Sequence, residues 1–443
     1  MTPDLGGAAA AEAARAHLVD ALGLALAGAS DERVARGDAA LRGEAAFALS
    51  LAVGALGLDD FDEATRAHPG AVLVPALAAA AVASDRPVAG ERFATALATG
   101  YQLFQGYGRM AGAAAMHPRG LHPTSLLGPL AAAGAVATLR GDAAEGRETA
   151  VRIAASLAAG IVEFDARETM RAVQTAWAAV SGVRAARLAE AGFPASANAL
   201  DAPGGLLGRD PAIDRDGLAA DPLAGALAIE LVSFKPYPHF SDLHPATAAL
   251  VDALRSVPPS HVAGVSVRLG EKAASRLSAE FPPTTPKAAK RSARFALASV
   301  LARAIHGDDP SSLRGAFTAA RLADPEVLAL AERVRLGETL RDAPPTAAVV
   351  ALELDDGRLV EASALSYPGD GRDPGCRWGW EDAAARFDDV TAGLPAPARA
   401  VAARARALAE GLPAAADVRR PLAAVLGLVA GPGRRHRITD PEQ

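Results

Sequence analysis

Histidine is the side chain whose charge changes near neutral pH, and four of the nine histidines in this sequence stand directly before a proline. They are His68, His117, His122 and His244. A residue before proline is disfavoured in the helical conformation, so we expect these imidazoles at turns or at helix starts rather than on helix faces. Imidazoles at such positions could exchange a proton with a bound molecule.

The histidines fall in three polar stretches, which we treat as candidate site segments. They are LDDFDEATRAHPGA at residues 58–71, HPRGLHPTS at residues 117–125 and SFKPYPHFSDLHP at residues 233–245. A purely structural interpretation is open for each: an acidic turn that caps a helix, a helix N-cap formed by Thr124 or Ser125, and a proline-rich linker. The N-terminus of a helix also favours anions, so an acidic substrate group could bind at the second segment.

Metal and cofactor chemistry are not favoured by the motifs. His117 and His122, like His239 and His244, are five residues apart, which does not place two side chains on one helix face. The sequence contains no H-E-x-x-H motif and only one cysteine, and it has neither a glycine-rich phosphate loop nor a G-x-S-x-G nucleophile motif. We therefore expect acid–base chemistry carried by side chains alone, with no metal and no cofactor.

The composition of the 443 residues excludes several kinds of partner. Half of the residues are apolar, 45 are basic and 51 are acidic, so the formal charge is -6 and no basic excess is available to neutralise nucleic-acid phosphates. The single Cys376 excludes a disulfide framework. The N-terminus lacks the features of a secretory signal, and the apolar stretch at residues 70–84 is too short for a membrane span. We expect a cytoplasmic protein with no membrane or nucleic-acid partner.

Alanine- and leucine-rich segments with helical spacing dominate the first part of the chain. Alanine is the strongest helix former and is small enough to let helices approach closely, so these segments predict a compact helical bundle. The predicted helices cover residues 11–27, 43–56, 71–83, 90–106, 126–139, 148–162, 173–191 and 245–254.

The pattern after Pro258 is mixed and predicts an α+β region. The alternation over residues 261–270 indicates a strand, and the residues around Asp355-Asp356-Gly357 indicate a β-hairpin over residues 346–369. Helical spacing and capping residues predict further helices over residues 287–307, 324–336, 382–387, 395–411 and 421–429.

This organisation predicts a mainly α fold with a large all-helical domain and a smaller α+β domain. We place the helical domain at residues 1–257, completed by residues 381–430, and the α+β domain at residues 258–380. The last residues, 431–443, are expected to form a solvated tail.

Five segments carry a more specific signal. They are DALGLALAGAS, EAAFALSLAVGALGLDDFDEATRAHPGAVLVPALAAAA, GYQLFQGYGRM, RGLHPTSLLGPLAAAGAVATLRG and FKPYPHFSDLHPATAALVDAL. In order and spacing they resemble the MmgE/PrpD family, which includes 2-methylcitrate dehydratase, cis-aconitate decarboxylase and iminodisuccinate epimerase. The resemblance implies a helical domain with an α+β lid domain, a homodimer, and a metal-free site for a small carboxylate in the cleft between the domains.

Carried over residue by residue, the resemblance implies that the three polar stretches converge around one substrate. The implied catalytic residues are Asp60 in D-F-D, His68 in H-P-G, His122 in G-x-H-P-T and Lys235 in K-x-Y-P. The implied substrate-binding residues are Thr124, Tyr237, His244, His117, His239, Arg171 and Gln174.

The chemistry of carboxylates explains why such groups are wanted. Removing a proton or CO2 beside a carboxylate builds negative charge on carbon, which cationic donors stabilise while an imidazole exchanges the proton. Under the resemblance, His68 and His122 form the proton-transfer pair, Lys235 clamps a carboxylate and Asp60 orients a histidine. We expect a cofactor-independent lyase of the dehydratase or decarboxylase type. An isomerase or epimerase that uses the same deprotonation, and a non-catalytic binding protein, remain alternatives.

Two of the departures from the family pattern fall on candidate site residues. Arg171 stands where the family usually has lysine, and Gln174 stands where it usually has histidine. Arginine can still bind a carboxylate but does not readily exchange a proton, and glutamine cannot exchange one at all. We therefore expect a substrate that is less highly charged than the citrate derivatives.

Overall fold

The computed structural model describes residues 3–41, 43–113, 116–163, 169–207, 225–341, 343–344 and 346–431, and these fall into two compact units. The first unit contains the described residues of 1–163, 169–233 and 378–431, and the second contains those of 234–377. The division follows Ser233, so residues 234–257 group with the second unit, whereas the sequence pattern assigned them to the helical domain.

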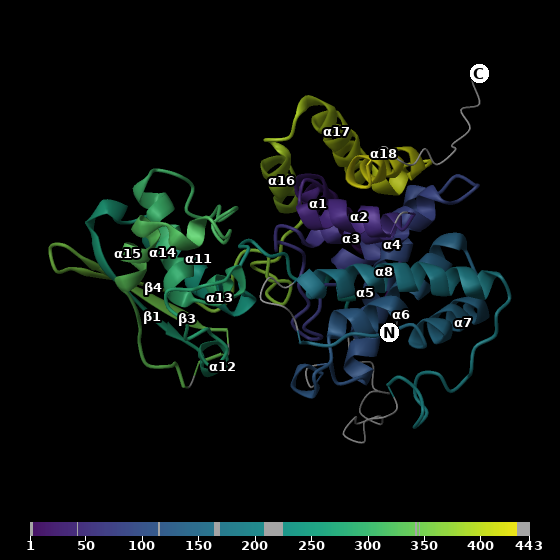
Figure 1. The fold of residues 1–443 in the computed structure, drawn as a ribbon, viewed down its shortest axis with the longest axis horizontal. Coiled ribbons are helices and arrows are strands. Elements are labelled where there is room, and N and C mark those ends of the chain that lie inside the picture. Colours follow the sequence, from purple (N-terminus) through teal and green to yellow (C-terminus); the bar gives the residue numbers. More distant parts are fainter. Residues whose placement is uncertain are drawn as a thin grey trace. The chain divides into compact units, whose positions relative to one another are not determined.

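The first unit is helical, and several of its helices pack against α6 (Pro123–Arg140), which Figure 1 labels. Nearly every residue of α6 is buried, which is typical of a helix surrounded by other helices. Its neighbours are α4 (Gly70–Val82), α5 (Gly90–Met110), α7 (Ala144–Ala155) and α8 (Thr169–Glu190). Small residues bring these helices close together. A Cβ atom added to Gly182 of α8 would lie only 2.4 Å from the Cβ of Ala132 of α6.

The remaining helices of the first unit come from both ends of the chain. The N-terminal ones are α1 (Ala8–Gly28), α2 (Glu32–Ala40) and α3 (Ala45–Gly54), and a short α10 (Ala228–Leu231) follows much later. The C-terminal helices α16 (Trp380–Thr391) and α17 (Ala396–Glu410) pack against α1, and α18 (Arg419–Val429) packs against α4. The first and last segments of the chain therefore share one core.

Helix α2 was missed by the sequence analysis. Of its nine residues only Val34 is buried and four are charged, so the segment is more polar than the alanine- and leucine-rich segments on which the predictions relied. The signal that was present is the N-cap: a carboxylate oxygen of Asp31 accepts a hydrogen bond from the backbone N–H of Arg33 at 2.8 Å.

The second unit contains a four-stranded sheet in the order β2-β1-β3-β4. β1 (Val262–Leu269) pairs in parallel with β2 (Val334–Leu336) and antiparallel with β3 (Ala348–Leu354), which in turn pairs antiparallel with β4 (Leu359–Ala364). The β3–β4 pair is the hairpin predicted around Asp355-Asp356-Gly357, and Gly357 adopts a positive φ of 83° in its turn.

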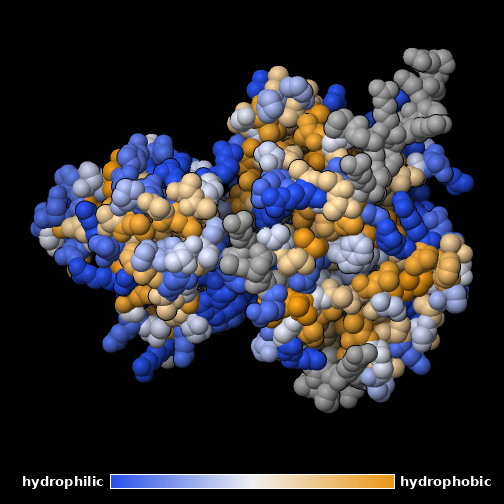
Figure 2. Space-filling model, viewed as in Figure 1, coloured by the Kyte–Doolittle hydropathy of each residue, from blue (hydrophilic) through white to orange (hydrophobic). Residues whose placement is uncertain are grey.

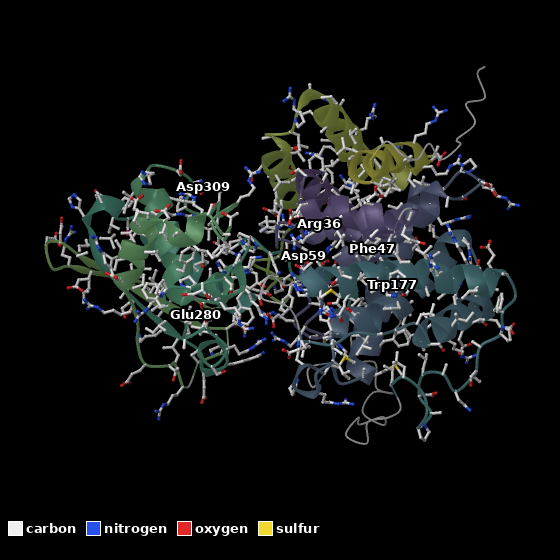
Figure 3. All side chains as sticks on the ribbon, in the orientation of Figure 1. Arg36, Phe47, Asp59, Trp177, Glu280 and Asp309 are labelled. Carbon is white, nitrogen blue, oxygen red and sulfur yellow. The ribbon has the colours of Figure 1, made fainter. Side chains whose placement is uncertain are left out.

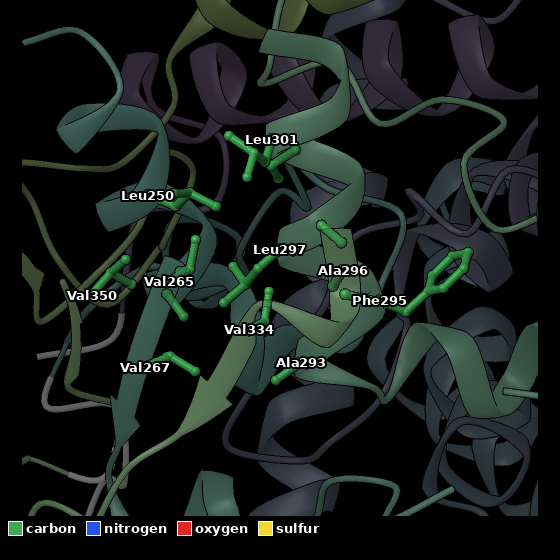
Figure 4. Close-up of a cluster of buried hydrophobic side chains, with 14 of the residues drawn as sticks. Leu250, Val265, Val267, Ala293, Phe295, Ala296, Leu297, Leu301, Val334 and Val350 are labelled. Atoms are coloured by element: carbon green, nitrogen blue, oxygen red, sulfur yellow. The ribbon is translucent and has the colours of Figure 1, made fainter. Parts of the chain in front are cut away.

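The core of the second unit lies between this sheet and the helices α11 (His244–Ala253) and α14 (Ala293–Ile305). Figure 4 shows Leu250 of α11 and Leu297 of α14 beside Val265 and Val350 of the sheet. Alternate residues of β1 and β3 are buried, as expected for strands that have one face against a core. The combination of a mainly helical chain with a small sheet agrees with the mainly α fold that the sequence predicted.

Two predicted helices of this unit were wrong in extent. The helix expected over residues 287–307 is two helices, α13 (Pro286–Lys290) and α14, because Ser292 breaks the first and caps the second by accepting from the N–H of Phe295. The helix expected over residues 324–336 ends earlier, as α15 (Pro325–Glu332). Val334 is buried and pairs with Val265, so sheet pairing overrides the helical pattern there.

No described helix combines the length and the apolar character that crossing a membrane would require. On the face drawn in Figure 2, hydrophilic and hydrophobic side chains are interspersed over both units.

The start of α5 provides a test of the packing in the first unit. The N–H of Gly90 donates to the carbonyl of Ala415 at 2.7 Å, and an added Cβ atom would lie 1.5 Å from the carbonyl oxygen of Leu412. We predict that Gly90→Ala lowers the free energy of unfolding by roughly 1–3 kcal/mol, measured by chemical denaturation. Gly106 lies on the same helix with no atom within 4 Å of such a Cβ. Gly106→Ala should raise stability by about 0.5–1 kcal/mol, and an equal effect of both changes would contradict this packing.

Candidate functional site

A tight loop in the first unit, residues 59–69, carries the first candidate segment. Backbone hydrogen bonds between Asp62 and Ala67 close the loop in both directions, at 2.8 and 3.3 Å. Within it, Arg66 adopts a left-handed conformation with φ of 56°, which is unusual for a residue other than glycine and is often found at functional sites. The Asp62 carboxylate accepts from the hydroxyl of Thr65 at 2.6 Å, and burial raises the pKa of this carboxyl to about 6. Asp62 therefore holds the loop together.

His68 lies near the end of this loop, and one of its ring nitrogens, Nδ1, is hydrogen-bonded. Its Nδ1 lies 2.7 Å from the backbone carbonyl oxygen of Asp60 and 3.0 Å from a carboxylate oxygen of Asp59. A carbonyl oxygen only accepts hydrogen bonds, so Nδ1 carries the proton. Within the described part of the chain, Nε2 of His68 has no hydrogen-bond partner. In its neutral form, the ring therefore presents the lone pair of Nε2 to whatever binds beside it.

The carboxylate of Asp60 does not take the position expected of it. It accepts the N–H of Gly70 at 2.9 and 3.1 Å and the hydroxyl of Tyr101 at 2.6 Å, whereas only the backbone carbonyl of Asp60 contacts His68. The carboxylate on His68 belongs to Asp59, which Figure 3 labels. The resemblance implied only that Asp60 orients a histidine. Asp60 contacts His68 through its backbone carbonyl, and the neighbouring carboxylate is that of Asp59.

The second candidate segment meets the first at the start of α6. His122 is the N-cap residue of α6, and its Nδ1 lies 2.7 Å from the hydroxyl oxygen of Ser125. Thr124 and Ser125 do not cap the helix, which was one of the interpretations left open. Instead, the hydroxyl of Thr124 accepts the backbone N–H of His68 at 3.2 Å and so links the two segments.

His122 is a neutral imidazole. It is only 3% exposed, and this burial is the main reason why its pKa lies well below its usual range. Electrostatic interactions with Arg171, His68 and His117 lower the pKa of His122 further. The rings of His117 and His122 are 6.5 Å apart. In the first unit, Arg171, His68 and His117 thus lie near enough to His122 to affect its pKa, and Thr124 is hydrogen-bonded to His68.

Gln174 has a different role from the one that the sequence suggested. Its side-chain oxygen accepts the N–H of Ile161 at 2.8 Å, and its nitrogen donates to the carbonyl of Ile161 at 3.1 Å. The neighbouring Gly160 accepts the backbone N–H of His122 at 3.2 Å. Because both ends of the amide are bound to the backbone, Gln174 supports the segment that holds His122 and is not presented as a substrate ligand.

The third candidate segment lies in the second unit, where its aromatic and imidazole rings stack on one another. The Tyr237 ring lies parallel to His239 at 5.5 Å, and the His244 ring meets them edge-on at 5.4 and 5.0 Å. His239 contacts the carbonyl of Phe240 and the hydroxyl of Thr247, and Nε2 of His244 lies 3.1 Å from the carbonyl oxygen of Tyr237. These three residues pack within the core of their own unit.

Burial also keeps this pair of histidines neutral. It lowers the pKa of His239 to about 4 and that of His244 well below its usual range. The charge of the buried Lys235 lowers both pKa values further. That Lys235, Tyr237, His239 and His244 share a substrate with the first unit stays a prediction.

Other features bear on ligand binding in the first unit. A cavity of about 750 Å³ is lined by Leu121 and Leu126, which lie before and after His122 in sequence. Met116, Arg119, residues at and just after the end of α7 and residues within 196–207 also line it. His122 itself is not part of its lining. Among the residues that the structure describes, no group of three or more histidine, cysteine or acidic side chains is arranged to hold a metal ion.

Sequence reasoning missed Asp59 and Tyr101 as members of the site. Asp59 is adjacent to the selected Asp60, so the acidic run gave the right place but not the right carboxylate. Tyr101 is fully buried on α5, far from the polar stretches in sequence, and no motif pointed to its contact with Asp60.

Comparison with known proteins gives two findings. Residues 4–209 match the MmgE/PrpD N-terminal domain. The chain is also similar to the cis-aconitate decarboxylase-like protein oryM of Aspergillus oryzae (strain ATCC 42149 / RIB 40), with 34% identity over 144 residues. That match covers 31% of this chain and 30% of the relative, so the chain spans less than a third of the curated protein that it matches.

The lowered pKa of His239 makes stability depend on pH. Its folded pKa of about 4 lies below the usual value of about 6.5, so between these values the unfolded chain binds a proton that the folded chain does not. This residue therefore lowers the free energy of unfolding as the pH falls, by about 2 kcal/mol between pH 7 and 5. We predict that His239→Gln removes that part of the acid destabilisation, measured by urea unfolding at a series of pH values.

His306 offers a control of opposite sign. It is exposed, and its contact with Glu326 raises its pKa, so its contribution to stability is present at low pH and is lost as the pH rises. His306→Gln should therefore steepen the loss of stability on acidification, where His239→Gln makes it shallower. Parallel pH profiles for the wild type and His239→Gln would show that the imidazole is not buried as described.

Proposed function

We propose that this chain is a lyase that removes water or CO2 from a small carboxylate, because its residues 4–209 match the MmgE/PrpD N-terminal domain. The cis-aconitate decarboxylase-like relative supports a reaction of this type. In this proposal the chemistry is carried by acidic and basic side chains without a cofactor.

The observation that carries the proposal is the tautomer of His68. Nδ1 is held by the Asp60 carbonyl at 2.7 Å and by the Asp59 carboxylate at 3.0 Å, so Nε2 is the basic nitrogen. A carboxylate beside Nδ1–H also stabilises the imidazolium that forms when Nε2 accepts a proton. His68 is therefore equipped to take a proton from carbon and to return it.

His122 is suited to be the second member of a proton-transfer pair. As a neutral imidazole with a lowered pKa, it gives up readily any proton that it takes up. In a dehydration, one imidazole accepts the proton from the carbon beside the carboxylate, and the electron pair forms the double bond as the C–O bond breaks. The imidazolium formed in this way passes its proton to the departing hydroxyl group, directly or through the other imidazole, so that water leaves and both rings are neutral again.

A decarboxylation would use the same groups differently. The bond between carbon and the carboxylate breaks, CO2 leaves, and the electron pair that remains on carbon accepts a proton from an imidazole ring that has first taken up that proton from solvent. In both reactions negative charge develops next to the carbon that reacts. Arg171, whose positive charge lowers the pKa of the nearby His122, is our candidate for stabilising that charge. Thr124 and His117 are proposed to bind the substrate beside it, and Lys235 is proposed as a second carboxylate clamp.

We predict that His68→Gln and His122→Gln each lower kcat by about 100- to 10,000-fold while the protein stays folded. The assay incubates the full chain in D2O with cis-aconitate, 2-methylcitrate and simple dicarboxylates, and follows products and C–H signals by NMR. The expected result is loss of water or CO2 from one of these acids. Decarboxylation should place deuterium on the carbon that lost CO2, whereas dehydration should remove the C–H signal beside the carboxylate. His306→Gln, an exposed histidine, is the matched control and should keep full activity.

The same experiment separates the alternatives. Deuterium incorporation with inversion and no loss of water or CO2 would identify an isomerase or epimerase. Absence of both turnover and exchange with every acid would contradict the lyase and favour a binding protein. Full activity in both His68→Gln and His122→Gln would remove the assignment of the proton-transfer pair.

A further inference from the structure

A buried polar network lies directly beneath the loop that presents His68. Its members come from α1, α5, α16 and the loop itself, and each is less than 10% exposed: His17, Asp20, Tyr101, Arg386 and Asp60. Neither the family resemblance nor the sequence motifs assigned a role to His17, Asp20, Tyr101 or Arg386. Buried groups of this kind need partners, because an unpaired charge in the interior is strongly unfavourable.

The outer part of the network is an ion pair between Asp20 and Arg386. The guanidinium donates from Nε to the Asp20 carboxylate at 2.6 Å, a second guanidinium nitrogen contacts the same oxygen, and the guanidinium also lies over the ring of Trp378. Burial raises the pKa of Asp20, and the charge of Arg386 acts against that rise. The one arginine of the network is thus engaged by the carboxylate of Asp20.

The inner part is centred on the Asp60 carboxylate. The Tyr101 hydroxyl donates to its Oδ2 at 2.6 Å, and Nδ1 of His17 lies 3.4 Å from the same oxygen. Tyr101 keeps its proton, because burial and the negative charge of Asp60 raise its pKa well above 10. The single hydroxyl proton of Tyr101 is therefore directed at Asp60.

The surroundings of the His17 ring fix where its protons are. Its Nε2 lies 3.0 Å from the carbonyl oxygen of Ile229, which can only accept, so Nε2 carries a proton. Its Nδ1 faces the Tyr101 oxygen at 3.1 Å and Asp60 Oδ2 at 3.4 Å. Since the Tyr101 proton points to Asp60, both of these oxygens offer Nδ1 a lone pair. A hydrogen on Nδ1 can be donated to one of these oxygens, whereas an unprotonated Nδ1 would face two acceptors and form no hydrogen bond.

We propose that His17 is a buried imidazolium, paired with Asp60, and that it acts as a positioning residue for His68. The link runs through a single residue: the Asp60 carboxylate faces His17, and the Asp60 carbonyl receives the Nδ1–H of His68. This part of the inference rests on the proposed function, because it matters only if His68 exchanges a proton through Nε2. Fixing the Asp60 peptide fixes the tautomer and the direction of the His68 ring.

The experiment uses the full chain with ¹⁵N-labelled histidine and two-bond ¹H–¹⁵N correlation spectra near neutral pH. Spectra of His17→Gln and His68→Gln assign the two rings. We expect the His17 ring to show two protonated nitrogens, and the His68 ring to show a protonated Nδ1 and a bare Nε2. In His17→Gln we expect His68 to populate both tautomers, whereas the exposed control His306→Gln leaves the His68 signals unchanged.

Kinetics give a second readout. If the lyase activity is found, His17→Gln should lower kcat by about 10- to 100-fold with little change in KM, because the substrate is still bound while the base is misdirected. If the protein turns over no carboxylate, the spectra still decide the protonation of His17 and its effect on His68. Failure of the proposed function is therefore distinguishable from failure of this inference.

Two results would overturn the proposal. One is a neutral His17 ring with one bare nitrogen, and the other is a His68 tautomer that His17→Gln leaves unchanged. If His17→Gln does not fold, Tyr101→Phe serves instead, since it removes the hydroxyl but keeps the ring. In Tyr101→Phe, Asp60 remains the partner of Nδ1, so His17 should stay doubly protonated; a neutral ring in this folded variant would also overturn the proposal.

Discussion

The hydrogen bond from Nδ1 of His68 to the carbonyl of Asp60 is the interaction on which the rest of the site depends. It leaves Nε2 as the basic nitrogen and turns the ring toward whatever binds. The carbonyl can do this only because its own residue is held in place, with the carboxylate of Asp60 bound to the N–H of Gly70 and to the hydroxyl of Tyr101. The Asp60 carbonyl therefore orients His68, while the Asp60 carboxylate holds the loop in place.

The helical packing of the first unit is what makes this arrangement possible. The groups around Asp60 come from α1, α4 and α5, and α6 supplies Thr124 and His122. Helices can converge so closely on a loop only where their contacts are made by alanine and glycine, as at Gly182 against Ala132. The plain composition of the chain is thus connected to its chemistry, because small residues bring distant polar groups within hydrogen-bond distance.

Sequence reasoning predicted the features that are set by local patterns. The long helices, the strand β1 and the β3–β4 hairpin follow from periodicity and from Asp355-Asp356-Gly357. It failed where tertiary contacts decide, as at Val334, which a helical pattern assigned to a helix but which pairs with Val265 in the sheet. The site shows the same limit. The acidic run located the loop, but only the structure shows that the carboxylate beside His68 is that of Asp59 and not that of Asp60. Likewise, only the structure shows that the side-chain amide of Gln174 binds the backbone.

A crystal structure with a bound, unreactive carboxylate would test the central claim most directly. The account predicts that the ligand contacts the first unit between His68 and His122, with the reacting carbon within reach of Nε2 of His68 and a carboxylate oxygen near Arg171. A carboxylate bound away from His68, or a His68 ring turned so that Nε2 rather than Nδ1 meets the Asp60 carbonyl, would contradict it.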